Sequence, residues 1–429
     1  MEDVNPAQGH LITVRFKTRH SVENIRDAMR HMLLIYPKLR SVVVPTLFSY
    51  NRLRIFDDDD RRIAALFKDA FRVKRDLQHD SEAYIEYRRN LFNEPFSLEQ
   101  GLPIKIRYIP DCPKPILLMS LNHTVADGMG WLHMVDSLMA YLNGKRPHLV
   151  PLDNPSLMPS LLEPPYYKVP IKFYKSLNIY ARDAYKLTGK TIIPASSRPA
   201  NFFGPLDLQH HTLSYDLASI KSRSKTFGCS ITVLLSAALA ISLSRRYGKD
   251  MGDVIGIPVQ VDLRPYFDGE KPIFGNYLRA SMITIHRKDW EDRSTRIIKM
   301  IETQLTQQLR QIKNKEILFP LLIEKINTLM GKKNYARFVR MLRRKRKLCR
   351  MTSSISNIGN TDGMNSHGAK AQVCEVISTT QYHGLLLSFS SIDGQINTVF
   401  SYPEAEFSRE EIQDLIRSFE QALGELLEG

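Results

Sequence analysis

An apolar run followed by a change of periodicity marks the middle of the first half of the chain. Residues 116–121 are apolar except for one serine and follow Pro113 and Pro115, which predicts a buried strand. Apolar residues then recur at 131, 134, 135, 138 and 142, the spacing of one face of a helix. A strand-to-helix turn therefore falls on residues 122–128, whose sequence is Asn-His-Thr-Val-Ala-Asp-Gly.

The same patterns predict the elements before this turn. Alternation of apolar and polar residues over 11–16 predicts a strand. Ser21 is suited to cap a following helix whose apolar positions begin at Val22 and reach Leu33. Further patterns predict strands at 41–44 and 104–109, a helix at 63–71 and a loop at 91–98.

The second half of the chain repeats this order after a proline-rich connection. Seven prolines lie between Pro147 and Pro170, and a Tyr/Lys-rich stretch runs from Tyr166 to Lys175. Beyond them we expect strands at 211–214, 254–261, 274–285, 385–390 and 398–402, and helices at 177–187, from 217, at 231–245 and after Ser408. The pattern predicts an N-terminal lobe at 1–150, a crossover linker at 151–205 and a C-terminal lobe at 206–429.

The hydrophobic content, the cysteines and the apolar runs limit the classes of protein to which this chain can belong. Hydrophobic residues are 43% of 429 residues, ample for a large core in one two-lobed body or in two or three domains. The four cysteines (Cys112, Cys229, Cys349 and Cys374) form no Cys-x-x-Cys pair, which argues against a disulfide framework or a zinc site. We see no signal peptide in residues 1–20, and the longest mostly apolar run, 231–243, is too short to span a bilayer. These features predict a cytoplasmic protein.

His123 is the first candidate for chemistry, because it stands where the predicted strand ends. Reactive side chains are often carried by loops that rigid elements hold in place. Histidine is the side chain best matched to proton transfer near neutral pH. A neutral imidazole here can take a proton from a hydroxyl or amine as that group attacks a carbonyl. A structural histidine at a strand end is the alternative.

Asp127 and Gly128 complete the turn. The carboxylate of Asp127 has two roles open to it: orienting the imidazole of His123 directly, or locking the loop by pairing with a cation elsewhere. We expect Gly128 to give the turn a backbone conformation that other residues resist.

Five short motifs, in order along residues 10–425, resemble those of the CoA-dependent acyltransferase superfamily. That superfamily contains condensation domains, wax-ester and diacylglycerol acyltransferases, alcohol acetyltransferases and chloramphenicol acetyltransferase. Residues 123–128 match its His-x-x-x-Asp-Gly. The other similar segments are Tyr36-Pro37-Lys38-Leu39-Arg40, Glu94-Pro95-Phe96-Ser97-Leu98, Leu263-Arg264-Pro265 with Gly275-Asn276, and Ser356-Asn357-Ile358-Gly359.

The resemblance implies a fold and a set of roles. The fold is α/β (α+β), with two similar chloramphenicol-acetyltransferase-like lobes of mostly antiparallel or mixed sheet, flanked by helices, and a tunnel between them. His123 is then the general base of an acyl transfer from a thioester to a hydroxyl or amine. Coenzyme A or phosphopantetheine serves as co-substrate, with no tightly bound cofactor and no metal. Arg264 pairs with Asp127 across the lobes, and Ser354, Asn357 and Asn276 are candidates for the oxyanion or acceptor side.

Two departures from the family pattern affect the choice of branch. Condensation domains usually carry a second histidine before the catalytic one, where this chain has Asn122. The Asp-Phe-Gly-Trp-Gly mark of plant acyltransferases is absent. Two other functions therefore stay open: a non-catalytic member acting as a binding or scaffold protein, and a metal hydrolase using His123, Asp127 and His133.

The net charge of +15 is concentrated in one segment. Residues 309–350 contain 14 Lys/Arg against 2 Glu, and a helix with Tyr335, Phe338, Val339 and Leu342 on one face is predicted there. A solvated helix face is the simplest interpretation. An acidic acyl-carrier protein, the phosphates of CoA, or an anionic membrane contacted through 334–350 are the functional ones. We expect no nucleic acid partner and a monomer.

Overall fold

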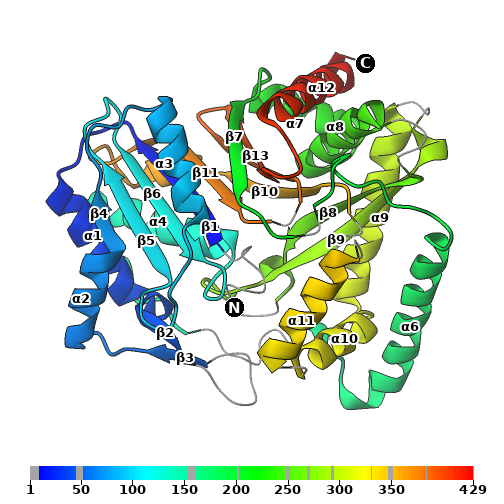
Figure 1. The fold of residues 1–429 in the computed structure, drawn as a ribbon, viewed down its shortest axis with the longest axis horizontal. Coiled ribbons are helices and arrows are strands. Elements are labelled where there is room, and N and C mark those ends of the chain that lie inside the picture. The colour runs from blue at the N-terminus through cyan, green and yellow to red at the C-terminus, as the bar shows by residue number, and fades with distance from the viewer. Residues whose placement is uncertain are drawn as a thin grey trace.

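The protein is described here by a computed structural model that covers residues 9–44, 52–152, 161–200, 202–247, 252–267, 271–290, 294–329, 331–345, 351–382 and 384–428. The described chain forms two lobes, each built on one mixed sheet with helices against it (Figure 1). A small two-stranded sheet, β2 (Ser41–Val44) with β3 (Arg52–Ile55), lies at the edge of the first lobe.

The sheet of the first lobe has five strands in the order β11-β1-β6-β5-β4. All neighbours are antiparallel except β4 and β5, which are parallel. The strands are β1 (Gly9–Phe16), β4 (Phe71–Val73), β5 (Ile104–Ile109), β6 (Ile116–Asn122) and β11 (Val373–Thr380). Helices of this lobe are α1 (Val22–Ile35), α2 (Arg61–Ala70), α3 (Glu82–Asn93) and α4 (Gly128–Leu142), with the 3-10 turn η1 (Pro37–Arg40).

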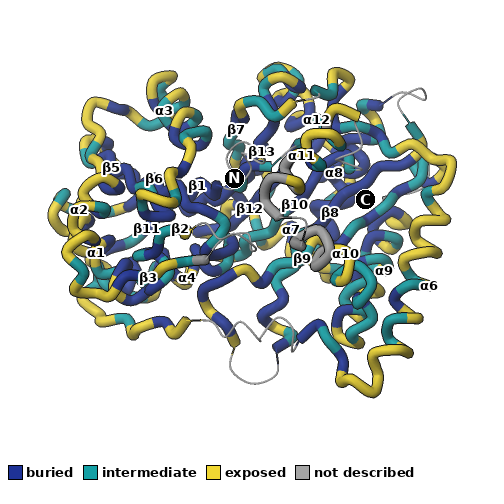
Figure 2. Tube along the Cα trace, turned by 60° about the horizontal axis from the view of Figure 1, so that its bottom comes forward, coloured by how far each residue is buried: buried dark blue, intermediate teal, exposed yellow. Residues whose placement is uncertain are grey.

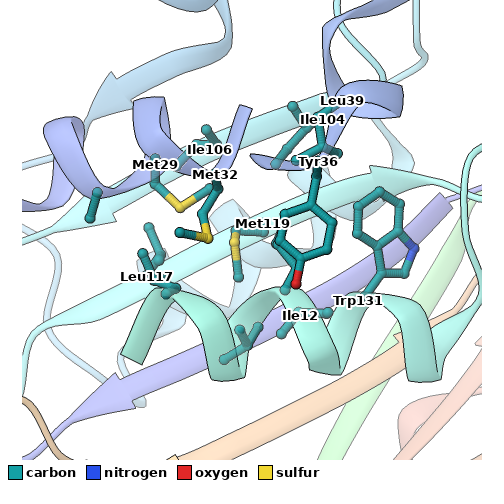
Figure 3. Close-up of a cluster of buried hydrophobic side chains, with 14 of the residues drawn as sticks. Ile12, Met29, Met32, Tyr36, Leu39, Ile104, Ile106, Leu117, Met119 and Trp131 are labelled. Atoms are coloured by element: carbon teal, nitrogen blue, oxygen red, sulfur yellow. The ribbon is translucent and has the colours of Figure 1, made fainter. Parts of the chain in front are cut away.

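The sequence of strand β6 is an almost unbroken apolar run because both faces of the sheet are covered by other elements. Leu117 and Met119 point into the core formed with α1 and α4, where Figure 3 shows them beneath Met29 and Met32. The intervening Leu118 points into the other core, which includes Leu91 and Phe92 of α3.

The sheet of the second lobe has six strands in the order β7-β13-β12-β10-β8-β9. Strand β10 runs parallel to β12 and β8, and the other neighbours are antiparallel. The strands are β7 (Leu206–Thr212), β8 (Val254–Asp262), β9 (Leu278–His286), β10 (Ser354–Asn360), β12 (Leu386–Ile392) and β13 (Gln395–Pro403).

The helices of the second lobe surround this sheet (Figures 1 and 2). They are α6 (Val169–Lys186), α7 (Leu217–Thr226), α8 (Ile231–Arg246), α9 (Ser294–Lys313), α10 (Leu318–Leu329), α11 (Gly331–Arg344) and α12 (Arg409–Glu428), with the 3-10 turns η2 (Tyr166–Lys168), η4 (Arg264–Tyr266), η5 (Arg287–Asp289) and η6 (Asp362–His367). Helix α8 is buried from Val233 to Leu243, as its apolar sequence predicts. Within the described ranges no single helix is long and apolar enough to cross a bilayer; α7 and α8 would suffice together by length and composition, but the chain bends by 92° between them.

One strand of the first lobe, β11, comes from the second half of the chain. It pairs with β1 as an outer strand of the first sheet, from His10 opposite Thr380 to Phe16 opposite Val373. The first lobe is therefore completed by residues far beyond the proline-rich connection. Sequence periodicity predicted a strand at β1, but it predicted neither β11 nor the pairing of the two.

Several predicted boundaries were wrong. The loop expected at 91–98 begins later, because α3 continues to Asn93 and its amide donates to the carbonyl of Arg89. The strand expected at 211–214 is β7, which ends at Thr212, and the strand expected from Phe274 starts at Leu278, since residues 274–277 turn towards the first lobe. The basic segment is helical as predicted, in α10 and α11. Residues 346–350 lie outside the described residues, as does the side chain of Tyr335.

Candidate active site

His123 lies in the turn between β6 and α4, and its side chain is half-buried. The neighbouring Asn122 is buried at the end of the strand, and its side-chain oxygen accepts a hydrogen bond of 3.0 Å from the backbone N–H of Thr124. An asparagine at this position therefore closes the turn that projects the histidine. This accounts for Asn122 in structural terms, where condensation domains usually have another histidine.

Asn276, from the second lobe, holds the imidazole of His123 from one side. Its Nδ2 donates to the backbone carbonyl of His123 at 2.7 Å, and its Oδ1 lies 2.9 Å from His123 Nδ1. A carbonyl can only accept, so the first bond fixes which end of the amide is the oxygen. That oxygen can only accept as well, so Nδ1 must carry a proton, and in the neutral imidazole Nε2 then carries the lone pair.

The basic nitrogen is left open. Among the described residues none forms a hydrogen bond with His123 Nε2. A neutral imidazole oriented in this way is ready to accept a proton from a bound molecule.

His10 of β1 packs against His123, with the two ring centroids 4.3 Å apart and the planes tilted by 42°. The ring of His10 is 3% exposed, its Nδ1 lies 2.6 Å from the hydroxyl of Thr380, and its buried Nε2 has no partner in the described part of the chain. Burial, and then the nearby charge of His123, hold the pKa of His10 well below its ordinary value. His10 is therefore neutral at physiological pH.

Asp127 binds Arg264 and not His123. Arg264 Nη2 and Nη1 lie 3.0 and 3.1 Å from the two carboxylate oxygens, a bidentate pair. The same carboxylate also accepts from the backbone N–H groups of Gly130 and Tyr277, at 2.9 and 2.7 Å. The predicted ion pair between the lobes is thus present, and of the two roles open to Asp127 it has the locking one.

Arg264 is fully engaged in this junction. Its side chain is 6% exposed and also donates to Asp262 and to the backbone carbonyls of Pro272, Ile273 and Gly275. Burial alone would lower the pKa of Arg264, but the charges and hydrogen bonds of Asp127 and Asp262 raise it above its ordinary value. The pair holds the chain on either side of Asn276, since the carbonyl of Gly275 accepts from Arg264 and the N–H of Tyr277 donates to Asp127.

An aromatic contact reinforces the same junction. Phe274 of the second lobe packs against both Tyr36 and Trp131 of the first, with its ring centroid 4.8 and 4.9 Å from theirs. Tyr36 and Trp131 lie side by side at one end of the first core (Figure 3). The tyrosine hydroxyl is bound to α4 through Ser137 at 2.8 Å. Tyr36 of the Tyr-Pro-x-Leu-Arg segment therefore helps to seat the residues that carry Asn276.

In this turn, the position where a side chain would be crowded is Gly130 and not Gly128, the residue that we expected to be special. Gly128 has no positive φ, and a Cβ built on it would approach His10 no closer than 4.0 Å, so the expectation about its backbone was wrong. Gly128 is instead the first residue of α4, capped by Asp127. Gly130 is the crowded position, because a Cβ there would lie 3.1 Å from the Cβ of Ala126.

The other site candidates lie in the second lobe without a contact to His123. Ser354 is buried and its hydroxyl donates to the carbonyl of Pro258 at 3.1 Å, which joins β10 to β8. Asn357 donates to the hydroxyl of Thr232 in α8 at 2.8 Å and accepts from the N–H of Gly359. Of Ser354, Asn357 and Asn276, the structure brings only Asn276 to the histidine.

No group of three His, Cys, Asp or Glu side chains suited to a metal ion occurs within the described ranges. Both oxygens of Asp127 are occupied by Arg264, and His133 lies on the exposed side of α4. The grouping of His123, Asp127 and His133 considered from the sequence therefore does not form.

The sequence did not predict that Asn276 and His10 contact the imidazole of His123. Asn276 was singled out as part of a Gly-Asn mark, but with another role in view. One feature of the sequence could have indicated His10, a histidine immediately before the strand predicted at 11–16. No pattern in the sequence indicates that β1 and β6 are neighbours.

Comparisons with known proteins confirm the fold. The first condensation domain of the CDA synthetase is similar in structure, with a TM-score of 0.72 at 11% identity over 99% of this chain and 92% of that one. The trichothecene 15-O-acetyltransferase of Fusarium sporotrichioides is similar at a TM-score of 0.70 and 13% identity, over 98% and 91%. The epimerization domain from the third module of tyrocidine synthetase B matches at 0.62 and 14%, over 99% and 93%.

No family model matches the sequence, and no curated protein matches it either. The structural similarity nevertheless spans nearly the whole chain. The protein has the same two-lobed α/β fold as these condensation, acetyltransferase and epimerization structures, which is the fold that the motifs predicted.

Proposed function

We propose that this protein is an acyltransferase that moves an acyl group from a thioester donor to a hydroxyl or amine acceptor, with His123 as the general base. The observation that carries the proposal is the hydrogen bonding of the imidazole. Asn276 holds Nδ1 in its protonated form, and Nε2 is left with a lone pair and no partner among the described residues. The similar structures include a condensation domain and an acetyltransferase, which supports acyl transfer as the class of reaction.

The chemistry needs no acyl-enzyme intermediate. Nε2 of His123 takes the proton from the acceptor as its oxygen or nitrogen attacks the thioester carbonyl carbon. The tetrahedral intermediate collapses, the carbon–sulfur bond breaks, and the leaving thiolate takes the proton back from the imidazolium. The histidine is thereby regenerated, and the products are the ester or amide and a free thiol.

The remaining assignments concern the co-substrates and the setting. Acyl-CoA or an acyl-carrier protein is the donor, so coenzyme A or phosphopantetheine acts as a co-substrate and not as a resident cofactor. A small alcohol or amine is the acceptor. Cys112, Cys229 and Cys374 are free thiols, which agrees with a reducing, cytoplasmic setting for a monomeric enzyme.

The test is release of free thiol from a panel of acyl-CoA thioesters and acylated carrier proteins, each with alcohol and amine acceptors. Wild-type protein is expected to release thiol in an acceptor-dependent way, and His123→Ala to lose this activity while remaining folded. His133→Ala is the matched control, since this histidine is exposed on the helix that follows the turn. If wild type binds acyl-CoA and releases no thiol with any acceptor, the protein is a binding or scaffold member of the fold.

A further inference from the structure

Exposed apolar side chains gather on one helix of the second lobe. Of the large hydrophobic side chains that are exposed in the described part of the chain, seven lie between residues 166 and 185. They are Tyr166 (96% exposed), Tyr167 (75%), Val169 (37%), Ile171 (63%), Tyr174 (65%), Tyr180 (47%) and Tyr185 (79%). Figure 2 shows α6 as a largely exposed element at the edge of the molecule.

These side chains follow the helical repeat. Ile171, Tyr174, Asn178, Ala181 and Tyr185 are spaced by three or four residues, so they form one stripe along α6, and all are exposed. Tyr166 and Tyr167 lie in the turn η2 just before the helix. We call this set the outer stripe.

The opposite side of α6 is fixed to the body of the lobe. Phe173 and Tyr180 pack on Phe319 of α10, with ring centroids 6.0 and 4.9 Å apart, and the buried hydroxyl of Ser176 accepts from the N–H of Phe319 at 2.9 Å. The helix cannot therefore roll its outer stripe inward without losing these contacts. The stripe is a permanent feature of the surface.

Basic residues border the outer stripe on one side. Lys168, Lys175, Arg182 and Lys186 recur with the spacing of a neighbouring helical row. Between residues 166 and 190 there are six basic residues and one acidic residue. Lys172 and Lys175 share Glu316, and Arg182 and Lys186 share Asp183, so four cations meet only two carboxylates and the face stays positive.

The basic segment found in the sequence forms a separate basic surface on the far side of α10 from α6 (Figure 1). α6 and α11 lie on either side of α10 at the same end of the lobe (Figure 1). The side chains of Arg337, Arg340, Arg344 and Lys345 are exposed on and just after α11. On α10, Leu322 and Ile323 are 43% and 36% exposed.

We infer that the outer stripe of α6, together with the basic residues that border it, docks on the surface of an anionic membrane. Tyrosine and isoleucine suit the boundary between headgroups and acyl chains, where a ring is buried and its hydroxyl stays wet. Lysine and arginine beside them can extend their charges to anionic headgroups while their stems cover apolar surface. An acidic protein partner would use the charge but would leave the aromatic and aliphatic stripe in water.

The inference is tested by flotation with vesicles of phosphatidylcholine alone and of phosphatidylcholine with phosphatidylserine, at low and moderate salt. Wild type is expected to float with the anionic vesicles and to bind less as salt rises. The triple variant Ile171→Ser, Tyr174→Ser, Tyr185→Ser keeps every charge and should lower the partition coefficient about tenfold or more, because the removed side chains supply the buried apolar area. The variant Lys168→Gln, Lys175→Gln, Lys186→Gln should lose about fivefold per charge on anionic vesicles only.

Leu149→Ser with Leu152→Ser is the matched control, since these exposed residues (64% and 53%) lie away from α6 in sequence and should change nothing. All variants should keep the wild-type melting temperature, which excludes misfolding as the cause. The inference is overturned if wild type does not float with anionic vesicles, or if the triple serine variant floats as well as wild type. It is also overturned if the stripe mediates a dimer in sedimentation that the triple variant dissolves, with no vesicle binding. None of these outcomes depends on acyl transfer.

Discussion

His10 and His123 lie ring against ring with their centroids 4.3 Å apart, and the buried member of the pair is His10, which lies outside the turn of residues 122–128. A positive charge that forms on His123 during proton transfer therefore meets an uncharged ring. A protonated neighbour at this distance would oppose that charge. The neutrality of His10 is thus part of what makes His123 able to act as a base.

The buried His10 should make the protein sensitive to acid. Its folded-state pKa is below the unfolded value near 6.5, so the unfolded chain binds more protons as pH falls. The free energy of unfolding is then unaffected by His10 above about pH 7 and decreases below about pH 6.5, by up to about 1.4 kcal/mol per pH unit. His10→Phe removes this titration. Urea unfolding between pH 5 and 8 should give a shallower slope for the variant than for wild type, and identical slopes would contradict the prediction.

Asn276 should be needed for rate and not for stability of the lobes. Asn276→Ala leaves His123 free to rotate and to change tautomer, so we expect kcat for acyl transfer to fall about a hundredfold with KM nearly unchanged. Asn276→Asp keeps an acceptor for Nδ1–H and should retain more activity than the alanine variant. Steady-state kinetics decides this, with thermal melts as the control for folding. An alanine variant at full rate would show that the contact does not orient the base.

Asp127 and Arg264 should be coupled energetically. Asp127→Asn or Arg264→Gln strands a buried charge, and each should destabilise the protein by about 3–5 kcal/mol. The double variant should be less unstable than the sum of the two, because neither charge is then left alone. Denaturant unfolding of all four proteins measures the coupling. Strictly additive losses would mean that the pair contributes no interaction energy.

Gly130 and Gly128 form a matched pair for testing packing in the turn. Gly130→Ala places a methyl group 3.1 Å from the Cβ of Ala126, so the helix or the turn must shift, at a cost of about 1–3 kcal/mol. Gly128→Ala meets nothing closer than 4.0 Å and should be neutral or slightly stabilising. Melting temperatures of the two variants test the contrast. Equal losses from both would contradict it.

The sequence predicted those parts of the fold and the site that depend on local pattern. The alternation in β1, the apolar run of β6 and the helical spacing in α4 were enough to place His123 at a strand end. The motif resemblance added the pairing of Asp127 with Arg264. The role of Asn276 and the presence of His10 beside His123 could not be predicted, because both depend on contacts between segments more than 100 residues apart. Hydrophobic periodicity carries no information on which strands become neighbours.

The pairing of β1 with β11 has a consequence for the order in which the protein can form during synthesis. Until residues 373–380 have left the ribosome, one edge of β1 has no partner strand, although β6 and the whole His123 turn have long been made. An open edge of this kind is a template for pairing with other chains. Contacts of such long sequence separation also form slowly. The sheet of the first lobe is therefore expected to stay incomplete, and prone to aggregate, until almost the entire chain has been synthesised. This makes the nascent chain a candidate client for chaperones that shield unpaired strands.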